Sequence, residues 1–350
     1  MRVVCVRQHG GPEVLKLEDL PRPELTGEDQ VLVAMKAAAL NHLDLWVRKG
    51  LPGVKLPMIP GSDGAGVVVD IGKGIKGLAA GDEVVIQPGT FCGQCPNCLD
   101  GHENLCPEYG ILGETEDGVQ AELVALRAAN VFKKPSGLDF QEAASFGLVF
   151  LTAYQMLVKR ARLEAGETVL IVGGSSGVGA AAIQIATRLG ARVIATASKG
   201  RKTEFVKSMG AEEVVDHYEA DWFKRVLDMA GSRKVQVVFE HVGSATWDQS
   251  MRTMGHGARL AVCGATTGAE VSINLRHTFR KHLSILGSTM GDLDTFQAVI
   301  NEFEAGHYRA FVDRSFPMDK IAEAHAYLES GEHQGKVVIT IPGGNPDEGS

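Results

Sequence analysis

The pattern of apolar and polar positions changes along this chain of 350 residues. Over the first 130 residues, short apolar runs such as "QVLVAMKAAAL" and "GAGVVVDIG" are separated by Gly, Pro and Asp, which is typical of β-strands and turns. From about residue 165, six β-branched runs alternate with mostly helical stretches: "TVLIVGG", "ARVIATAS", "EEVVDHY", "VQVVFEHVG", "ARLAVCGA" and "LSILGST". Near-continuous apolar strands between helices predict a parallel sheet covered on both faces, as in doubly wound dinucleotide-binding domains.

The end of the chain departs from this alternation. "DLDTFQAVINEFEAG" and "IAEAHAYLESG" have the spacing of amphipathic helices, and "GKVVITI" follows them as a single strand. We expect this strand to return to the β-rich region. The sequence therefore predicts an α/β protein with a β-rich domain over 1–130, completed by 310–350, and a dinucleotide-binding domain over 131–309.

Composition and charge narrow the class of protein. The chain is 44% hydrophobic and 22% charged, as globular proteins are, and it contains no apolar run long enough for a membrane helix. Its net charge is −8 with no basic stripe, which argues against nucleic acid as a partner. The first residues, "MRVVCVRQHG", lack the pattern of a secretory signal, so a cytoplasmic location is expected.

The segment "VLIVGGSSGVGAAAIQIA" reads as a strand, a glycine-rich turn and a helix. The amino end of such a helix presents free N–H groups and a positive dipole to a pyrophosphate. Ser176 departs from the common G-x-G-x-x-G pattern, which has glycine there. The predicted pyrophosphate contacts are Gly174, Ser176, Gly177, Val178 and Gly179.

The turn after the second predicted strand indicates which nicotinamide cofactor binds. NAD-dependent proteins of this fold carry an acid at the end of that strand, whereas this chain has Ala197 followed by Ser198, Lys199, Arg201 and Lys202. A hydroxyl and cations would hold a 2′-phosphate that an acid would repel. We therefore expect NADPH rather than NADH, with Ser198 and Lys202 as contacts; the alternative is a solvated basic turn.

Four of the six cysteines fall within "FCGQCPNCLDGHENLCP" with the spacing C-x₂-C-x₂-C-x₇-C: Cys92, Cys95, Cys98 and Cys106. Disulfides are disfavoured in a chain without a secretory signal, and a bacterial ferredoxin-type cluster has a shorter last spacing. Four thiolates close the tetrahedral shell of Zn²⁺, so we expect one structural zinc per chain.

Together, the cysteine segment, "GSDGAGVV", "LTAYQML", "GGSSGVG" and "GKVV" resemble the medium-chain dehydrogenase/reductase superfamily over residues 1 to about 341. That superfamily includes zinc alcohol dehydrogenases and zinc-free quinone oxidoreductases. The resemblance implies a GroES-like catalytic domain that carries the zinc lobe, and a Rossmann cofactor domain between the two parts of it.

The resemblance also shows where this chain departs from the alcohol dehydrogenases. At the positions of their three catalytic zinc ligands it has Asn41, Ser62 and Leu148, which cannot replace thiolate and imidazole. Leu43 and Trp46 occupy the positions of the residues that carry the alcohol proton. The resemblance therefore implies an active site without a catalytic metal.

The segment "LNHLDLWVRKG" is similar to the quinone oxidoreductase branch, where Asn and Asp occupy the places of Asn41 and Asp44. His42 matches a position that contacts the cofactor pyrophosphate in relatives; the alternative is a surface loop histidine. A different metal site built from His42, Asp44 and Asp63 also remains open.

A site without a metal favours hydride transfer to an activated alkene or a quinone, because the developing charge is spread over a conjugated system and hydrogen-bond donors suffice. We expect the nicotinamide in a cleft between the domains, near Asn41, Thr152, Gly264 and Ser288. In this hypothesis Asn41 donates to the carbonyl of a small enone, enoyl or quinone substrate, and Asp44 orients Asn41.

Three alternatives stay open at this point: an NADP-dependent alcohol or aldehyde dehydrogenase, an enoyl-CoA reductase with a basic cleft mouth, and an NADPH-binding protein without catalysis. The apolar strand "LSILGSTM" corresponds to the edge through which relatives pair, so a homodimer or homotetramer is expected.

Overall fold

A computed structural model describes residues 1–342. The part of the expected first domain at 343–350 lies outside the described residues. The chain divides into two compact units, one formed by Met1–Leu148 with the segment from Gly291 onward, and the other by Val149–Met290. Within residues 1–342 no helix is long and apolar enough to cross a membrane.

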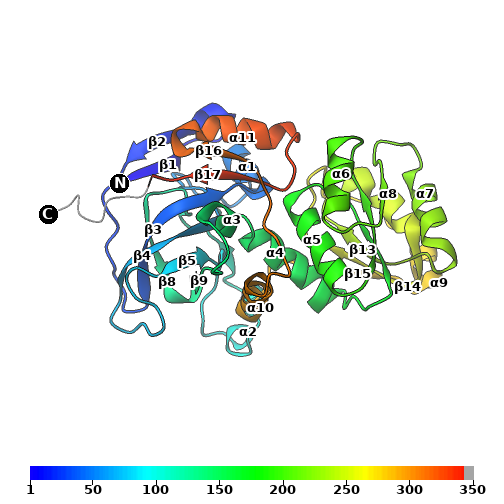
Figure 1. Cartoon of the computed structure of the whole chain (residues 1–350), viewed down its shortest axis with the longest axis horizontal. Coiled ribbons are helices and arrows are strands. Elements are labelled where there is room, and N and C mark those ends of the chain that lie inside the picture. The colour runs from blue at the N-terminus through cyan, green and yellow to red at the C-terminus, as the bar shows by residue number, and fades with distance from the viewer. Residues whose placement is uncertain (343–350) are drawn as a thin grey trace. The chain divides into compact units, whose positions relative to one another are not determined.

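The first unit is built on a seven-stranded sheet with the order β16-β17-β3-β4-β5-β9, in which β8 also pairs with β3 (Figure 1). The strands and helices of this unit are β1 (Arg2–Val6), β2 (Leu15–Asp19), β3 (Gln30–Ala39), α1 (His42–Lys49), β4 (Asp63–Ile71), β5 (Glu83–Ile86), β6 (Gly89–Thr90), α2 (Pro96–Leu99), β7 (Gly110–Ile111), β8 (Leu123–Arg127), β9 (Val131–Lys133), α3 (Phe140–Ala144), α10 (Leu293–Glu304), β16 (Val312–Pro317), α11 (Ile321–Ser330) and β17 (Lys336–Thr340). The last strand, β17, pairs antiparallel with β3, which confirms that the end of the chain returns to the β-rich unit.

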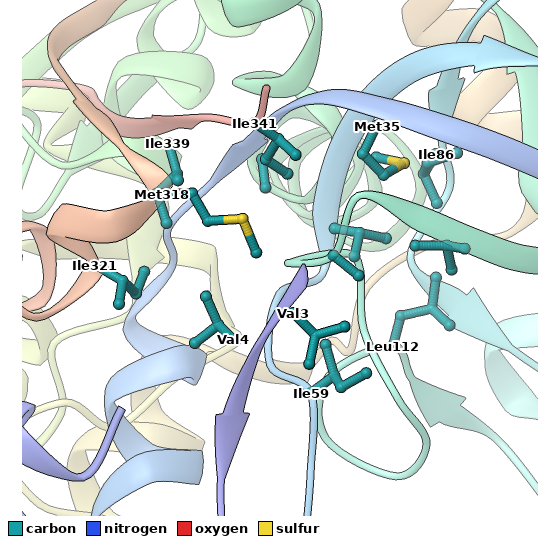
Figure 2. Packing of buried hydrophobic residues seen from close by; sticks show 14 of the residues in the cluster. Val3, Val4, Met35, Ile59, Ile86, Leu112, Met318, Ile321, Ile339 and Ile341 are labelled. Carbon is teal, nitrogen blue, oxygen red and sulfur yellow. The ribbon is translucent and has the colours of Figure 1, made fainter. Parts of the chain in front are cut away.

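The core of this unit brings both ends of the chain together. Figure 2 shows Val4 of β1 near Met318 and Ile321, with Ile339 of β17 on the same side of the cluster and Val3 farther away within it. All five side chains are buried. Burial of one such side chain contributes about 1.5–3 kcal/mol, so the terminal segment is an integral part of this core.

The second unit is a parallel sheet of six strands with the order β12-β11-β10-β13-β14-β15. Its elements are β10 (Thr168–Ile171), α5 (Gly177–Arg188), β11 (Arg192–Thr196), α6 (Arg201–Ser208), β12 (Glu213–Val215), α7 (Trp222–Ala230), β13 (Val235–Glu240), α8 (Ser244–Thr253), β14 (Met254–Val262), α9 (Leu275–Lys281) and β15 (Ser284–Gly287), and α4 (Gly147–Tyr154) leads into it. Numbered within the sheet, this order is 3-2-1-4-5-6, the order of a Rossmann fold. The six predicted strands and the doubly wound α/β class are confirmed.

The units divide at 148 and 291, whereas the sequence led us to expect 130 and 309. The difference comes from an aromatic cluster that ties α10 to the first unit. Phe296 of α10 lies with its ring centroid 5.0 Å from that of Phe132 of β9, and Phe303 lies 4.3 Å from Phe146. These partners are remote in sequence, so a local change of periodicity does not reveal them.

His325 of α11 provides a test of this core. Its side chain is fully buried, neither ring nitrogen has a partner among the described residues, and burial and the nearby Arg48 charge lower its pKa to about 3. In the unfolded chain His325 therefore takes up a proton as the pH falls through about 6.5, whereas in the folded chain it stays neutral until about pH 3. We expect stability to be lost as the pH falls below 6.5 toward 3, at up to about 1.4 kcal/mol per pH unit from this residue.

The variant His325→Leu should therefore show a shallower fall of the denaturant midpoint between pH 6.5 and 4.5 than the wild-type chain. His256→Leu, at an exposed histidine, is the control and should keep the wild-type slope. Identical slopes for all three proteins would contradict the assignment.

Candidate active site and the cysteine lobe

Three strand ends meet at one point of the first unit. Asn41 follows β3 and caps α1, Asp63 begins β4, and Lys336 begins β17. In the antiparallel register Ala39 is opposite both Asp63 and Val338, which carries Lys336 past the end of β3 to the level of Asn41. The sheet therefore brings together residues that are 295 positions apart.

The three side chains form a buried polar group. The Lys336 Nζ donates to Asn41 Oδ1 at 2.5 Å and to Asp63 Oδ2 at 2.9 Å, and Asn41 Nδ2 donates to the same Asp63 oxygen at 2.9 Å. Asn41, Asp63 and Lys336 are 7%, 0% and 4% exposed. An ammonium only donates and a carboxylate only accepts, so the amide of Asn41 can take only this orientation. One of its two N–H groups remains without a partner among residues 1–342.

The second oxygen of Asp63 is also engaged. Asp63 Oδ1 accepts the backbone N–H of Leu148 at 2.6 Å. Gly147 makes this approach possible, because a Cβ there would lie 2.7 Å from the same oxygen. Both carboxylate oxygens are thus satisfied, as a buried charge requires.

Asp44 lies beside this group but has a different contact. Its Oδ2 accepts the backbone N–H of Asn41 at 2.7 Å, and Gln120 Nε2 approaches its Oδ1 at 3.4 Å. Burial raises the pKa of Asp44 to about 6, against the lowering effect of the Asn41 N–H and the Lys336 charge. Asp44 therefore fixes the Asn41 backbone, whereas Asp63 and Lys336 hold the Asn41 amide.

Sequence reasoning did not find Lys336. The available signal was a charged residue at the start of an otherwise apolar strand, "GKVVITI". Such a residue is more often solvated than buried, so the strand alone does not single it out.

The donor set at this point does not fit a zinc ion. Ser62 is buried and its hydroxyl donates to the Leu112 carbonyl at 2.8 Å, and Leu148 offers a hydrocarbon side chain. The oxygens of Asn41 and Asp63 that could bind a cation already face an ammonium. His42 is exposed with its ring edge-on to Trp46. His42, Asp44 and Asp63, the residues considered for a different metal site, therefore do not converge on one point. Within residues 1–342 the four cysteines are the one group of three or more potential metal ligands that does.

The cysteines lie on a lobe of the first unit between β6 and β7. Cys92 and Cys95 precede α2, Cys98 lies within it, and Cys106 follows a short 3₁₀ turn. Their four sulfur atoms all lie within 4.8 Å of one another, with separations of 3.5–3.9 Å for the pairs Cys92–Cys98, Cys95–Cys98 and Cys92–Cys106. A tetrahedral zinc with Zn–S bonds of about 2.3 Å requires sulfur separations of about 3.8 Å, so the geometry fits.

Backbone N–H groups point at these sulfurs. Cys95 N–H approaches the Cys92 sulfur at 3.3 Å, and Glu108 N–H approaches the Cys106 sulfur at 3.3 Å. N–H donors, those of Gln94 and Cys95 above all, lower the pKa of Cys92 to about 7. Donors of this kind favour the thiolate form that binds a metal.

In the second unit, the predicted glycine turn joins β10 to α5. Ser176 caps the helix, with its hydroxyl accepting the Gly179 N–H at 3.0 Å. The N–H groups of Gly177 and Val178 lie at the open end of the helix, where no helical carbonyl can reach them. A Cβ on Gly179 would lie 2.3 Å from the Gly173 carbonyl oxygen, and one on Gly174 would crowd Ala195 and Ile183. The turn thus has the close packing and the free donors that a pyrophosphate needs.

His241, which sequence reasoning missed, lies beside this turn. It follows β13, its Nε2 is 3.4 Å from Ser176 Oγ, and a Cβ on Gly173 would come within 2.9 Å of the same nitrogen. Its position directly after a parallel strand was the available signal, because ligands bind at the carboxyl ends of such strands.

Two of the remaining residues predicted near the nicotinamide, Gly264 and Ser288, follow strands at the same edge of the sheet, whereas Thr152 lies in α4. Gly264 follows β14 close to the His241 carbonyl, and Ser288 follows β15 with its buried hydroxyl unpartnered among the described residues. Thr152 is buried with its hydroxyl 3.7 Å from the sulfur of Met290.

After β11 the chain continues with the basic turn. Ala197 is buried and its N–H donates to the Val215 carbonyl, which leaves Ser198 at the strand end with no acid beside it in sequence. Lys199 is engaged elsewhere, with its Nζ 3.1 Å from Glu219. Burial lowers the pKa of His217, and the nearby positive charge of Lys202 lowers it further.

A basic hollow of about 470 Å³ is lined by His256, Asn274, Arg276, His277, Arg280 and Lys281. It lies toward the amino end of β14, where Lys281 Nζ donates to the Met254 carbonyl, whereas Gly264 and Ser288 follow carboxyl ends of strands. At about 3.3 Å per residue these two edges are on the order of 20 Å apart. The hollow therefore lies away from Gly264 and Ser288, the residues predicted near the nicotinamide, and gives no support to a coenzyme A thioester substrate.

Fold and site together define a dinucleotide-dependent oxidoreductase with an attached cysteine lobe. Residues 27–136 match the family model of the alcohol dehydrogenase GroES-like domain, and residues 177–305 match that of the zinc-binding dehydrogenases. The human quinone oxidoreductase is 30% identical over 97% of this chain and 98% of its own. The chain belongs to the medium-chain dehydrogenase/reductase superfamily and is an NAD(P)-dependent oxidoreductase.

Two further relatives carry other activities in their names. A solved structure of an NAD-dependent alcohol dehydrogenase is 45% identical with a TM-score of 0.94, covering 97% of this chain and 99% of that one. The crotonyl-CoA carboxylase/reductase of Cereibacter sphaeroides is 29% identical over 95% of this chain and 85% of its own. The superfamily is thus certain, while its members differ in the reaction they carry out.

The cysteine lobe yields a test by metal analysis. We expect one zinc per chain in protein purified without added metal, and its loss in Cys95→Ser, because a hydroxyl does not replace a thiolate in a closed tetrahedral shell. Removal should lower the thermal midpoint, since the ion would tie together cysteines from both ends of the lobe. The control Cys263→Ser, at a cysteine outside the lobe, should keep its zinc. Full zinc content in Cys95→Ser would contradict this assignment.

Proposed function

We propose that this protein transfers hydride from NADPH to an activated alkene or a quinone, at an active site without a catalytic metal. The observation that carries the proposal is the orientation of the Asn41 amide, which is fixed by Lys336 and Asp63 and keeps one N–H for a substrate oxygen. The names of two relatives, a quinone oxidoreductase and a crotonyl-CoA carboxylase/reductase, support this class of acceptor.

Hydride delivery to the β-carbon of an enone turns the C=C bond into a C–C bond and places negative charge on the carbonyl oxygen. A bound nicotinamide would supply the hydride, and water would supply the proton to the α-carbon. Asn41 would stabilise the oxygen by donating its remaining N–H. Its amide is strengthened as a donor because its own oxygen accepts a bond from an ammonium. A preorganised donor of this kind contributes about 10²–10³-fold in rate.

A second candidate is an alcohol dehydrogenase, which the 45% identical relative favours by its name. That reaction develops an alkoxide at one carbon and benefits from a Lewis acid. Asn41, Ser62 and Leu148 are a poor donor set for zinc, and the Lys336 ammonium contacts the oxygens that would otherwise be available. This chemistry therefore favours the alkene or quinone acceptor.

We propose that the four cysteines hold one structural zinc. Cys92, Cys95, Cys98 and Cys106 would supply all four ligands, which leaves no open position for water or substrate. The ion would brace the lobe between β6 and β7 and would take no part in hydride transfer.

We propose NADPH rather than NADH because Ser198 and Lys202 stand where NAD-dependent proteins have an acid. Lys199 contributes less than the sequence suggests, since Glu219 already pairs with it. His42 remains a proposed contact of the pyrophosphate. NADH is the alternative that the name of the 45% identical relative favours.

We propose a homodimer or homotetramer that forms through β15. This strand is the last of its sheet, so one of its edges has no strand beside it in the described unit. Leu275 and Phe279 of the adjoining α9 are 73% and 66% exposed. An unpaired strand edge next to exposed large apolar side chains is characteristic of a surface that a second copy covers.

The proposed reaction is tested by the oxidation of NADPH with a panel of enones, quinones, aldehydes and alcohols. We expect turnover with enones or quinones, and Asn41→Ala should lower kcat/KM for them by about 10²-fold with the KM for NADPH little changed. Asn301→Ala, on the surface of α10, is the control. Turnover confined to alcohols and aldehydes would overturn the proposal, and tight NADPH binding without any turnover would support the non-catalytic alternative.

The cofactor preference is tested by dissociation constants. Loss of a charge-assisted hydrogen bond costs about 1.5–3 kcal/mol, so Lys202→Glu should weaken NADPH binding by about 10–100-fold and leave NADH binding nearly unchanged. Lys207→Glu adds the same charge farther along α6 and serves as the control. Equal dissociation constants for NADPH and NADH in the wild-type chain would show that the 2′-phosphate is not recognised.

A further inference from the structure

The buried pair of Lys336 and Asp63 needs an explanation beyond stability. The side chains of Lys336 and Asp63 are 5% and 0% exposed, and their charged atoms lie 2.9 Å apart. Burying such a pair costs desolvation energy that the mutual attraction seldom exceeds, so apolar residues would often serve the fold as well. A pair retained at this cost, in contact with the candidate substrate-binding amide, points to a role in the site.

We propose that Lys336 is a positioning residue of the active site. Its ammonium, anchored by Asp63, locks the Asn41 amide with one N–H directed away from the pair toward substrate, and it occupies the place at which a cation would otherwise bind. The first part of this inference rests on the function proposed above, whereas the second part concerns only the binding of cations.

The locking follows from the donors and acceptors. Without Lys336, the Asn41 amide could turn over, and its oxygen could face the substrate oxygen and repel it. With Lys336 in place, a flipped amide would set NH₂ against an ammonium at 2.5 Å and a carbonyl against a carboxylate at 2.9 Å. Only the orientation with an outward N–H avoids both conflicts.

The exclusion of cations follows from the charge. Asp63 and the Asn41 oxygen are hard oxygen donors that both face the Lys336 ammonium, so without that ammonium they would attract a divalent ion, and the Asp44 carboxylate beside Asn41 would add to the negative charge. The Lys336 Nζ bonds to two of these oxygens and leaves the third, on Asp44, engaged by the Asn41 N–H. A cation would have to displace the ammonium or bear its repulsion.

The kinetic test compares Lys336→Met with a matched control, Lys134→Met. Lys134 is a second lysine with a 5% exposed side chain; its Nζ lies 3.1 Å from Glu83 and donates to the Leu138 carbonyl, and it makes no contact with Asn41. We expect Lys336→Met to lower kcat for an enone or quinone by at least about 10-fold, with the KM for NADPH unchanged, and Lys134→Met to keep the wild-type kcat. Equal effects of the two variants on kcat would overturn the positioning role.

A double variant separates positioning from charge compensation. Lys336→Met leaves Asp63 without its partner, and the added Asp63→Asn removes that uncompensated charge. We expect the double variant Lys336→Met/Asp63→Asn to recover much of the lost thermal midpoint but none of the lost kcat. Recovery of kcat along with stability would show that Lys336 serves only to neutralise Asp63, and the inference would fall.

Titration with Co²⁺ tests cation exclusion without any assay of activity. The wild-type protein, with zinc already bound in its cysteine lobe, should bind no Co²⁺. The variant Lys336→Met, with zinc bound in the same way, should bind one equivalent of Co²⁺ through oxygen ligands, which is visible as the weak absorption bands of six-coordinate Co²⁺. No gain in the variant would overturn this part. Wild-type protein that reduces no enone or quinone would instead refute the proposed function, and the Co²⁺ result would still stand for or against the exclusion.

Discussion

The antiparallel pairing of β17 with β3 is the constraint on which the candidate site depends. It adds the last strand of the chain to a sheet whose other strands come from the first half, and its register sets Lys336 beside Asn41. The β3–β4 pairing brings Asp63 to the same level. A shift of β17 by one residue would turn Lys336 to the opposite face of the sheet and leave Asp63 as an unpaired buried charge. The core supports the register, because Ile339 and Ile341 are buried in the same apolar cluster as Met318 and residues of β1 (Figure 2).

The first unit therefore contains two polar sites that differ in how their negative charge is balanced. In the cysteine lobe, four sulfurs lie close together, and the N–H groups that point at them favour the negatively charged thiolate form, which suits an external cation. At the strand ends, the chain supplies its own cation, and the carboxylate and amide oxygens are neutralised from within. An ammonium stays in place and does not change its coordination, so it suits the fixing of a hydrogen-bond donor rather than the activation of an alcohol. The chain thus matches a family model of zinc-binding dehydrogenases and a quinone oxidoreductase alike, and it holds a lysine among the carboxylate and amide oxygens at these strand ends.

Much of the fold was predictable because its signals are local. The six strands of the Rossmann unit, their alternation with helices and the glycine turn before α5 all follow from apolar runs and turn residues that are contiguous in sequence. The division between the units was less predictable, since Phe132 and Phe146 bind α10 into the first unit across more than 140 intervening residues. His241 likewise gave only a weak signal: its place after β13 was evident, but its proximity to Ser176 depends on how β13 lies beside β10.

The sequence by itself determined the superfamily, the parallel sheet and the cysteine lobe. The four cysteines of the lobe lie within fifteen residues of chain, so their spacing alone restricts how they can converge. The resemblance also implies that Asn41, Ser62 and Leu148 occupy the positions of the metal ligands of the alcohol dehydrogenases. How the Asn41 amide is held was decided by the tertiary structure alone. The contact between Lys336 and Asn41 spans 295 residues, and no local pattern marks a lysine as buried rather than solvated. Only strand register and burial pair it with Asp63, and this pairing gives the Asn41 amide its direction.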